Sequence, residues 1–404
     1  RFLPTVHPIW VILALAFNPF IIWAATEIRV YALVLLLSSL LLQYFDDGYL
    51  GESSRRSHLV HAGLALVSLY TYYYLGFLLL AQAGALVLLR RWRSLWTYCL
   101  MMVAVGVGFT PMLVYIPQQT QGYTSALTQQ PSLSTALRLL SWRLQEQLLP
   151  AYWPPTIAIA RIIIAGLALL ACGLLIGQVR QRIASSHIAM WTILVITMCC
   201  SLAAYLATAE AFLESRHTTI FLIPLTLSVF ALLITTIRKQ GVFIWAITVL
   251  AFSVASDAAL YSHPAKTGDW ARVAAYLKAT ERQGQPILVS QALSAVPLSY
   301  YYSGVNQLVP VPRPEDFRKF NSPDLVLKDE RQLAELLAQT GSGGEVFWLV
   351  TDEMCELLGR DLNCHVLENF ISKNYVVEQS QDFFRSRARL LRRKTPTQTA
   401  PSAN

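Results

Sequence analysis

Nine long apolar runs divide the chain and restrict it to folds that place helices in a membrane. They stand at about 7–24, 28–45, 58–73, 75–90, 94–116, 157–178, 188–207, 217–237 and 241–260. Each run is close to the roughly 20 residues that an α-helix needs to cross the hydrocarbon core. Charged residues make up 14% of the chain, against about 25% in an average soluble domain. The composition excludes a disordered chain and an ordinary soluble enzyme, and we expect nine spans.

Basic residues occupy every second connection between these runs. They are Arg55-Arg56, Arg90-Arg91-Trp92-Arg93, Arg180-Gln181-Arg182 and Arg238-Lys239. Cytoplasmic loops carry an excess of Lys and Arg. We therefore expect these connections inside, and the loop 117–156 and everything after residue 260 outside. The protein would then be integral to the plasma (inner) membrane, with a periplasmic or extracellular active face.

The pattern changes after residue 260, which predicts two domains and a tail. Residues 1–260 form the transmembrane helical domain, 261–394 an external α/β domain, and 395–404 a disordered tail rich in Pro, Ser and Thr. Within 261–394, helical patterns at 269–279 and 331–338 alternate with apolar strand patterns at 286–289 and 346–350, and further strands are expected at 375–377 and 387–391. Such alternation is typical of α/β domains.

Cysteine and histidine patterns give no metal site. Cys355 and Cys364 are nine residues apart in the external domain. In an oxidising compartment they can form a disulfide, and two free thiols are an equal alternative. His58 and His61 are too few for a metal site, and packing between helices is the better interpretation. Asp46-Asp47 falls in an expected cytoplasmic loop and is interpreted as solvated.

The candidate site consists of polar residues at the external ends of spans. Glu27, Arg29 and Tyr31 open the second run, and Arg216-His217 opens the run at 217–237. An Arg near a helix N-terminus opposes the helix dipole, so it needs a partner such as a carboxylate or a phosphate. Each arginine also has an interpretation without a phosphate. Arg29 would form a local ion pair, and the Arg216 side chain would extend to the lipid headgroups.

An amphipathic helix is expected in the loop 117–156. Leu133, Leu137, Leu140, Leu144 and Leu148 repeat at helical spacing. A helix of this kind lies in the plane of the membrane interface. It either walls a site at the membrane surface or covers the bundle.

The ordered set of motifs resembles a family of membrane enzymes. Asn18-Pro19-Phe20 followed by Thr26-Glu27-Ile28-Arg29-Val30-Tyr31-Ala32-Leu33 is similar to the "NPF…QEARMYAL" element of bacterial glycosyltransferases related to protein O-mannosyltransferases. Later motifs follow in a similar order, namely Phe109-Thr110-Pro111, Arg216-His217, Ile223-Pro224-Leu225 and Asp269-Trp270-Ala271-Arg272. The resemblance covers most of the chain, and its single motifs are short. The family usually has Tyr where this chain has His217.

The resemblance implies a GT-C fold and an inverting transfer of a hexose or pentose. The donor would be a polyprenyl-phosphate sugar and the acceptor a glycan, lipid or protein. Arg29 and Arg216 would bind the donor phosphate, with Glu27, Tyr31 and His217 beside them. In the family, the acidic residue that acts as the catalytic base lies in a loop before the segment that residue 7 onward resembles. We therefore expect the base to lie N-terminal to Arg1. We also expect this chain alone to be inactive.

The sequence leaves the sugar, the acceptor, a divalent metal requirement and the oligomeric state open. Membrane lipids are expected partners, and nucleic acid is not, because no basic stripe with interleaved aromatics lies on a soluble element. A transporter and a non-enzymatic membrane scaffold are the alternative functions. A transporter is disfavoured because the two halves show no symmetry, whereas transporters place broken segments in matched halves.

Overall fold

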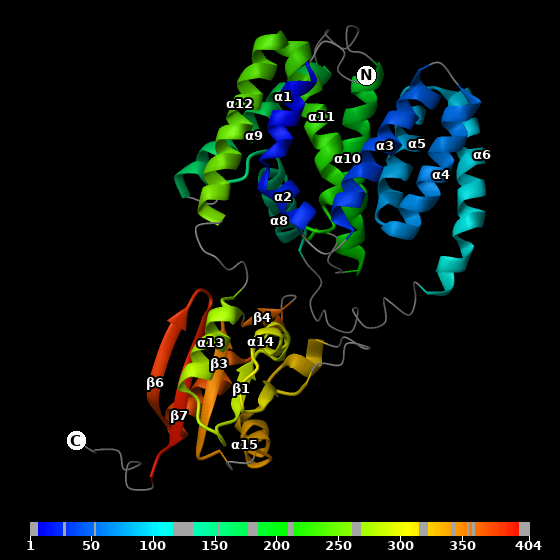
Figure 1. Ribbon diagram of the computed structural model, residues 1–404. Coiled ribbons are helices and arrows are strands. Elements are labelled where there is room, and N and C mark those ends of the chain that lie inside the picture. The colour runs from blue at the N-terminus through cyan, green and yellow to red at the C-terminus, as the bar shows by residue number, and fades with distance from the viewer. Residues whose placement is uncertain are drawn as a thin grey trace. The chain divides into compact units, whose positions relative to one another are not determined.

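The structure is a computed structural model and forms two compact units (Figure 1). It describes residues 7–26, 30–51, 54–115, 132–151, 154–176, 185–208, 213–260, 268–314, 322–340, 344–353, 355–357 and 360–395. The first unit holds the described residues up to Leu260, and the second holds those from Gly268 onward. Each unit has hydrophobic clusters of its own.

All regular secondary structure in the described part of the first unit is helical. Its helices are α1 Pro8–Ala16, α2 Pro19–Thr26, α3 Tyr31–Phe45, α4 Arg55–Thr71, α5 Leu75–Leu88, α6 Trp92–Phe109, α8 Leu133–Leu148, α9 Pro154–Ile176, α10 Ser185–Thr208, α11 Thr219–Thr236 and α12 Arg238–Leu260. A π-helical turn, Asp46–Leu50, extends α3, and a 3₁₀ turn, Thr110–Val114, extends α6.

Five helices in the described residues are long and apolar enough to cross a membrane. They are Tyr31–Leu50, Trp92–Val114, Ser185–Ala207, Thr219–Thr236 and Arg238–Leu260. The pair α1 and α2 becomes a sixth span if it is counted as one, but it bends by 69°. The helices at the other three expected runs, α4, α5 and α9, do not meet the same test of length and hydropathy over their described residues. Nine spans therefore remain a prediction.

The bend between α1 and α2 follows from two residues. Pro19 is the first residue of α2, where its missing N–H is no loss. Asn18 stands before it and accepts a hydrogen bond from the Phe20 N–H at 2.9 Å, which is an N-cap interaction. Proline in the apolar run at 7–24 predicts a helix break near Asn18. The break is confirmed, and the run is two helices.

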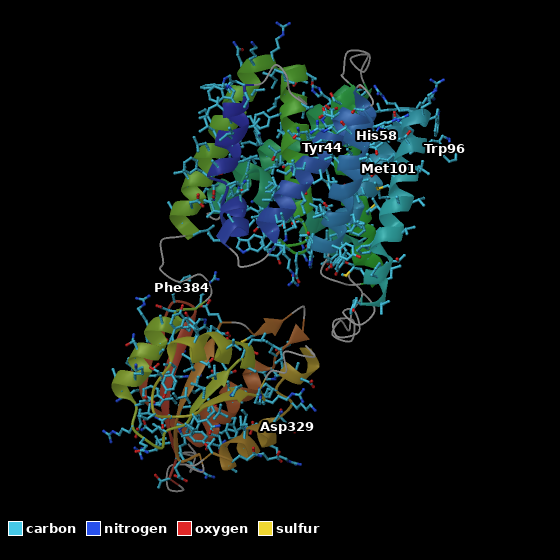
Figure 2. The ribbon with its side chains drawn as sticks, turned by 45° about the vertical axis from the view of Figure 1, so that its right-hand side comes forward. Tyr44, His58, Trp96, Met101, Asp329 and Phe384 are labelled. Atoms are coloured by element: carbon cyan, nitrogen blue, oxygen red, sulfur yellow. A yellow bond between two sulfur atoms is a disulfide. The ribbon has the colours of Figure 1, made fainter. Side chains whose placement is uncertain are left out.

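The outer surface of the bundle is apolar. Helix α11 is central, with most of its side chains buried, whereas α6 lies at the edge (Figure 1). Trp96 on α6 is 78% exposed and points outward (Figure 2), and Leu100, Val103 and Val107 continue the same exposed face. Soluble monomers rarely expose continuous apolar patches of this kind. A lipid environment accounts for the exposed face.

The second unit is a mixed α/β fold. Its strands are β1 Ile287–Ser290, β2 Leu308–Val311, β3 Val346–Asp352, β6 Tyr375–Phe383 and β7 Ser386–Arg393, in the sheet order β2-β1-β3-β7-β6. The first three of this order are parallel, and β7 and β6 are antiparallel to their neighbours. A separate pair is formed by β4 Glu356–Leu357 and β5 Arg360–Asp361.

Helices cover both faces of this sheet. α13 Trp270–Thr280 and α14 Ala295–Tyr301 pack on one face, and α15 Glu330–Ala338 and α16 Cys364–Asn374 on the other. Strand β1 is apolar on both sides, because Ile287 and Val289 join the first layer and Leu288 the second. The helices and strands expected from the sequence are present, and Cys355 forms a disulfide with Cys364.

Candidate functional site

The described candidate residues gather at one end of the helical unit. Tyr31 is the first residue of α3, and Arg216 and His217 stand directly before α11. Glu27 and Arg29 fall outside the described residues. Three of the five residues singled out by the sequence can therefore be compared in space.

Tyr72, in the turn between α4 and α5, joins these three residues. Its ring lies edge-on to Tyr31, with ring centroids 6.4 Å apart, and stacks with His217 at 6.3 Å. Its hydroxyl donates a hydrogen bond to the backbone oxygen of Arg216 at 3.1 Å. In the sequence, Tyr72-Tyr73-Tyr74 followed by Gly76 predicts a tight turn with interfacial aromatic rings. The structure confirms the turn, and the contacts of Tyr72 with the site were not predicted.

Further aromatic rings extend the cluster on both sides. Trp23 from α2 stacks on Tyr31 at 5.0 Å, and Tyr74 lies 4.5 Å from the His217 ring. Aromatic side chains offer a flat apolar face and, in Tyr and Trp, a polar tip. Tyr31 and Tyr74 are buried, so this end of the bundle holds packed aromatic rings next to the partly exposed Arg216.

Arg216 is held in place by an acidic neighbour. Its Nε lies 2.8 Å from Oε2 of Glu214, and the two side chains are 25% and 35% exposed. A guanidinium has five N–H donors, and one carboxylate engages two of them at most. Arg216 therefore keeps N–H groups that can bind an incoming anion, while Glu214 limits its movement.

A second guanidinium positions the segment before α11. Arg143 of α8 donates from Nε to the backbone oxygen of Leu213 at 3.0 Å and forms an ion pair with Glu146 at 2.8 Å. It also lies over the ring of Trp142 at 4.5 Å. These contacts tie α8 to the chain that carries Glu214, Arg216 and His217, so we assign Arg143 a positioning role.

A buried hydrogen-bond chain supports the same end of the bundle. Asn18 donates from Nδ2 to the backbone oxygen of Gln147 at 2.9 Å. Gln147 donates from Nε2 to the backbone oxygen of Thr218 at 2.8 Å. All three residues are buried. The break between α1 and α2, the end of α8 and the start of α11 are thereby fixed to one another.

In the second unit, the consecutive residues Tyr300, Tyr301 and Tyr302 divide into two kinds. Tyr300 and Tyr301 are exposed. The Tyr302 hydroxyl donates to Glu281 and accepts from the Asn306 backbone N–H. Burial and the bond to Glu281 raise the pKa of Tyr302. Tyr302 is therefore structural, whereas the rings of Tyr300 and Tyr301 are exposed and contact each other edge-on.

Neither a metal centre nor a known relative defines the site. Among the described residues, no group of three or more His, Cys, Asp and Glu side chains can hold a metal ion. No family model, curated protein or solved structure matches the chain.

Proposed function

We propose that this chain belongs to a membrane glycosyltransferase that moves a sugar from a polyprenyl-phosphate donor to an acceptor hydroxyl at the outer face of the membrane. The observation that carries the proposal is the meeting of Tyr31, Arg216 and His217 around Tyr72 at one end of an apolar bundle. A partly exposed guanidinium beside aromatic rings fits an anionic group on a long apolar chain. Arg29 and Glu27 follow α2 in sequence and are proposed to complete the donor site.

In the proposed reaction, the acceptor hydroxyl oxygen attacks the anomeric carbon as the bond from that carbon to the donor phosphate breaks. The configuration is inverted, and a carboxylate takes the hydroxyl proton. Arg216 and Arg29 stabilise the negative charge that grows on the departing phosphate. Glu27 would orient Arg29, and Tyr31 and His217 would line the donor site.

The distribution of basic residues supports the orientation. The helices alternate in direction, so the connections at Arg55 and Arg90–Arg93 and the start of α12 at Arg238 lie at the end of the bundle opposite Tyr72 and Arg216 (Figure 1). Basic residues mark the cytoplasmic side. The end with Arg216 and His217 is then proposed to face the outside, in a plasma membrane crossed by nine spans.

The proposal is tested by binding of farnesyl phosphate to the full chain in lipid nanodiscs. We expect Arg216→Ala to weaken binding about tenfold or more, because hydrogen bonds to charged groups contribute about 1.5–3 kcal/mol. Arg216→Lys keeps the charge but loses the planar fork, so its affinity should fall between the two. Arg138→Ala is the matched control, because Arg138 is an exposed cation of α8.

Unchanged binding by Arg216→Ala would remove Arg216 from the donor site. Equal losses in Arg216→Ala and Arg138→Ala would indicate general attraction to the membrane surface, which is the outcome that favours a scaffold. In a chain with sugar-transfer activity, Arg29→Ala and Arg216→Ala are each expected to abolish transfer and leave insertion unchanged.

A further inference from the structure

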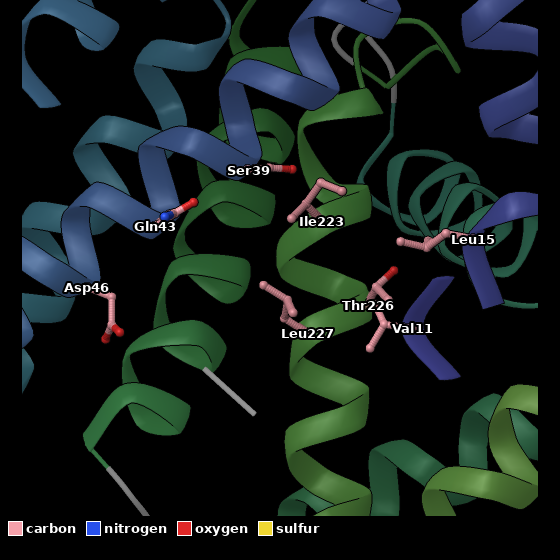
Figure 3. A pocket seen from close by; sticks show the side chains of 8 residues that line it. All are labelled: Val11, Leu15, Ser39, Gln43, Asp46, Ile223, Thr226 and Leu227. Carbon is pink, nitrogen blue, oxygen red and sulfur yellow. The ribbon is translucent and has the colours of Figure 1, made fainter. Parts of the chain in front are cut away.

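A cavity of about 380 Å³ lies between α1, α3 and α11, with Ser39, Gln43 and Asp46 of α3 and its π-helical extension on one side (Figure 3). Asp46 already takes part in an interaction within the protein, so the lining selects no particular occupant. A more specific chemistry is available at the disulfide of the second unit.

The two sulfur atoms of this disulfide have different surroundings. Cys355 follows β3 and is exposed, whereas Cys364 is the first residue of α16 and is partly buried. Exchange between a thiol and a disulfide begins when a thiolate attacks one of the two sulfurs, and access helps to decide which one. An incoming thiol therefore reaches Cys355 more readily than Cys364.

The start of α16 makes Cys364 the better leaving group. The sulfur that is not attacked departs as a thiolate, and it departs faster when that thiolate is stabilised. Cys364 opens a helix of 11 residues, and the positive end of a helix dipole stabilises a thiolate. The preceding Asn363 does not cap the helix, because its side chain donates to the backbone oxygen of Leu327 at 2.9 Å. No oxygen of the Asn363 side chain competes with the sulfur.

Gln291 provides a second source of stabilisation for Cys364. It directly follows β1, and its side chain is buried. Its Nε2 donates a hydrogen bond to Sγ of Cys364 at 3.5 Å. Hydrogen bonds become stronger when the acceptor carries a charge. The amide therefore stabilises the Cys364 thiolate more than it stabilises the neutral disulfide.

We propose that Cys355 is a site of mixed-disulfide formation with a small external thiol, and that Cys364 is the leaving group. The thiolate of the incoming molecule attacks Sγ of Cys355. The bond between Cys355 and Cys364 breaks, and its electron pair goes to Sγ of Cys364. One disulfide replaces another, so the step needs no oxidant. The modification does not depend on the sugar transfer proposed for the first unit.

The loop between the two cysteines makes the modification reversible. The Leu362 N–H donates to the backbone oxygen of Cys355 at 2.9 Å, and β4 pairs with β5 within the loop. The Leu362 side chain is buried against Ala292 and Leu325. These contacts do not involve the sulfur atoms, so they hold the Cys364 thiolate near Cys355 after exchange. The thiolate can then attack the mixed disulfide and restore the original bond.

The proposal is tested with reduced glutathione as the thiol and the full chain in lipid nanodiscs. Free thiols are first blocked with N-ethylmaleimide, glutathione is added, and acid stops the reaction at early times. Newly released thiols are labelled with deuterated N-ethylmaleimide, and peptide mass spectrometry locates both groups. Glutathione on Cys355 with the deuterated label on Cys364 should exceed the reverse arrangement about tenfold, because a hydrogen bond to a charged group corresponds to about that factor.

Gln291→Leu removes the donor and keeps a side chain of similar size. It should slow formation of the mixed disulfide about threefold or more, because the Cys364 thiolate loses one hydrogen bond. Gln339→Leu is the matched control, since Gln339 is an exposed glutamine at the end of α15, and its rate should equal that of the wild type. The positions of the labels in the wild type remain decisive if Gln291→Leu does not fold.

Three results would overturn the proposal. The first is a wild type in which glutathione is found mainly on Cys364 or equally on both cysteines. The second is a wild type that forms no mixed disulfide. The third is an equal rate of mixed-disulfide formation in folded Gln291→Leu and in the wild type.

Discussion

Asn18 is a single side chain that organises three helices. Its Oδ1 caps α2, and its Nδ2 bonds to the last turn of α8. The capping role is predictable, because Asn before Pro is a common start of a helix. The partner on α8 is more than a hundred residues away in the chain, and no local pattern indicates it.

Tyr72 illustrates the same limit at the candidate site. The sequence marks Tyr31, Arg216 and His217 because they are polar residues at span ends. Tyr72 lies in a run of three tyrosines that interfacial preference alone explains. Its role as the shared neighbour of Tyr31 and His217 depends on how α3, α4 and α11 pack, which single-helix patterns do not encode.

Glu368 gives a prediction for the pH dependence of the second unit. Two hydrogen bonds from Arg389, one of them 2.9 Å long, lower the pKa of Glu368. A carboxyl group with a lowered folded-state pKa stabilises the fold above its ordinary pKa of about 4.3, and this contribution is lost as the pH falls through the folded-state value. Wild-type protein should therefore lose stability below about pH 4.3.

The test is the thermal midpoint of the second unit in the full chain, measured between pH 6 and pH 3. Glu368→Gln should be less stable at pH 6 and should show a flatter pH dependence. Glu335→Gln, at an exposed position of α15, should keep the wild-type slope. Identical slopes for wild type and Glu368→Gln would contradict the assigned role of the Arg389 pair.

Among the helices and strands, the segments with a clear apolar pattern were predicted, and the edge strand β2 was missed. The helix at Leu133–Leu148 is confirmed, but its leucine face is divided. Leu140 and Leu148 are buried, whereas Leu133 and Leu137 are about half exposed. Helical spacing shows which residues share a face of the helix. How much of that face is buried depends on where the neighbouring helices pack.

Strand β2 was missed for a local reason. It has four residues, Leu308–Val311, and includes Pro310. Proline in a strand pattern argues against a strand except at an edge, where its missing N–H does not break a ladder. β2 is the edge strand of the sheet, so tertiary position accounts for a residue that the sequence pattern disfavours.

The disulfide gives a prediction for one element of the second unit. Cys355 and Cys364 connect the segment after β3 to the start of α16, with Cα atoms 5.6 Å apart. Replacing both by Ser should lower the free energy of unfolding by about 2–4 kcal/mol, since the cross-link restricts the unfolded chain. Chemical denaturation of the full chain measures the change.

Reduction with dithiothreitol should destabilise the wild type by a similar amount and leave the double variant unaffected. Cys99→Ser is the control, because Cys99 is a free thiol in the first unit. A wild type that responds to reductant like the double variant would show that the two thiols are not paired.

At the scale of the whole molecule, charge separates the two ends of the helical unit. The described connections at Arg55 and Arg90–Arg93 and the start of α12 at Arg238 lie at one end, and Tyr72, Arg216 and His217 lie at the other. This arrangement predicts which residues an impermeant maleimide reaches in intact cells. Ser215→Cys and Ser303→Cys should be labelled from outside, and Ser54→Cys only after the membrane is opened.

The labelling requires Ala in place of the four cysteines that precede residue 260, which are Cys99, Cys172, Cys199 and Cys200. The same background without an added cysteine is the control. Labelling of Ser54→Cys and Ser215→Cys from the same side would contradict the alternating topology. It would also remove the outer-face position of the proposed donor site.

The sequence alone predicted an apolar helical part followed by an α/β part, and the kinds of residue at the candidate site. Apolar runs near membrane length, basic residues in alternate connections and an α/β pattern after residue 260 are local properties, so they can be read without a structure. Only the tertiary structure decided that Tyr72 joins Tyr31 to His217 and that Ser39, Gln43 and Asp46 face a cavity. Those contacts join residues far apart in the chain, and they arise from the packing of whole helices.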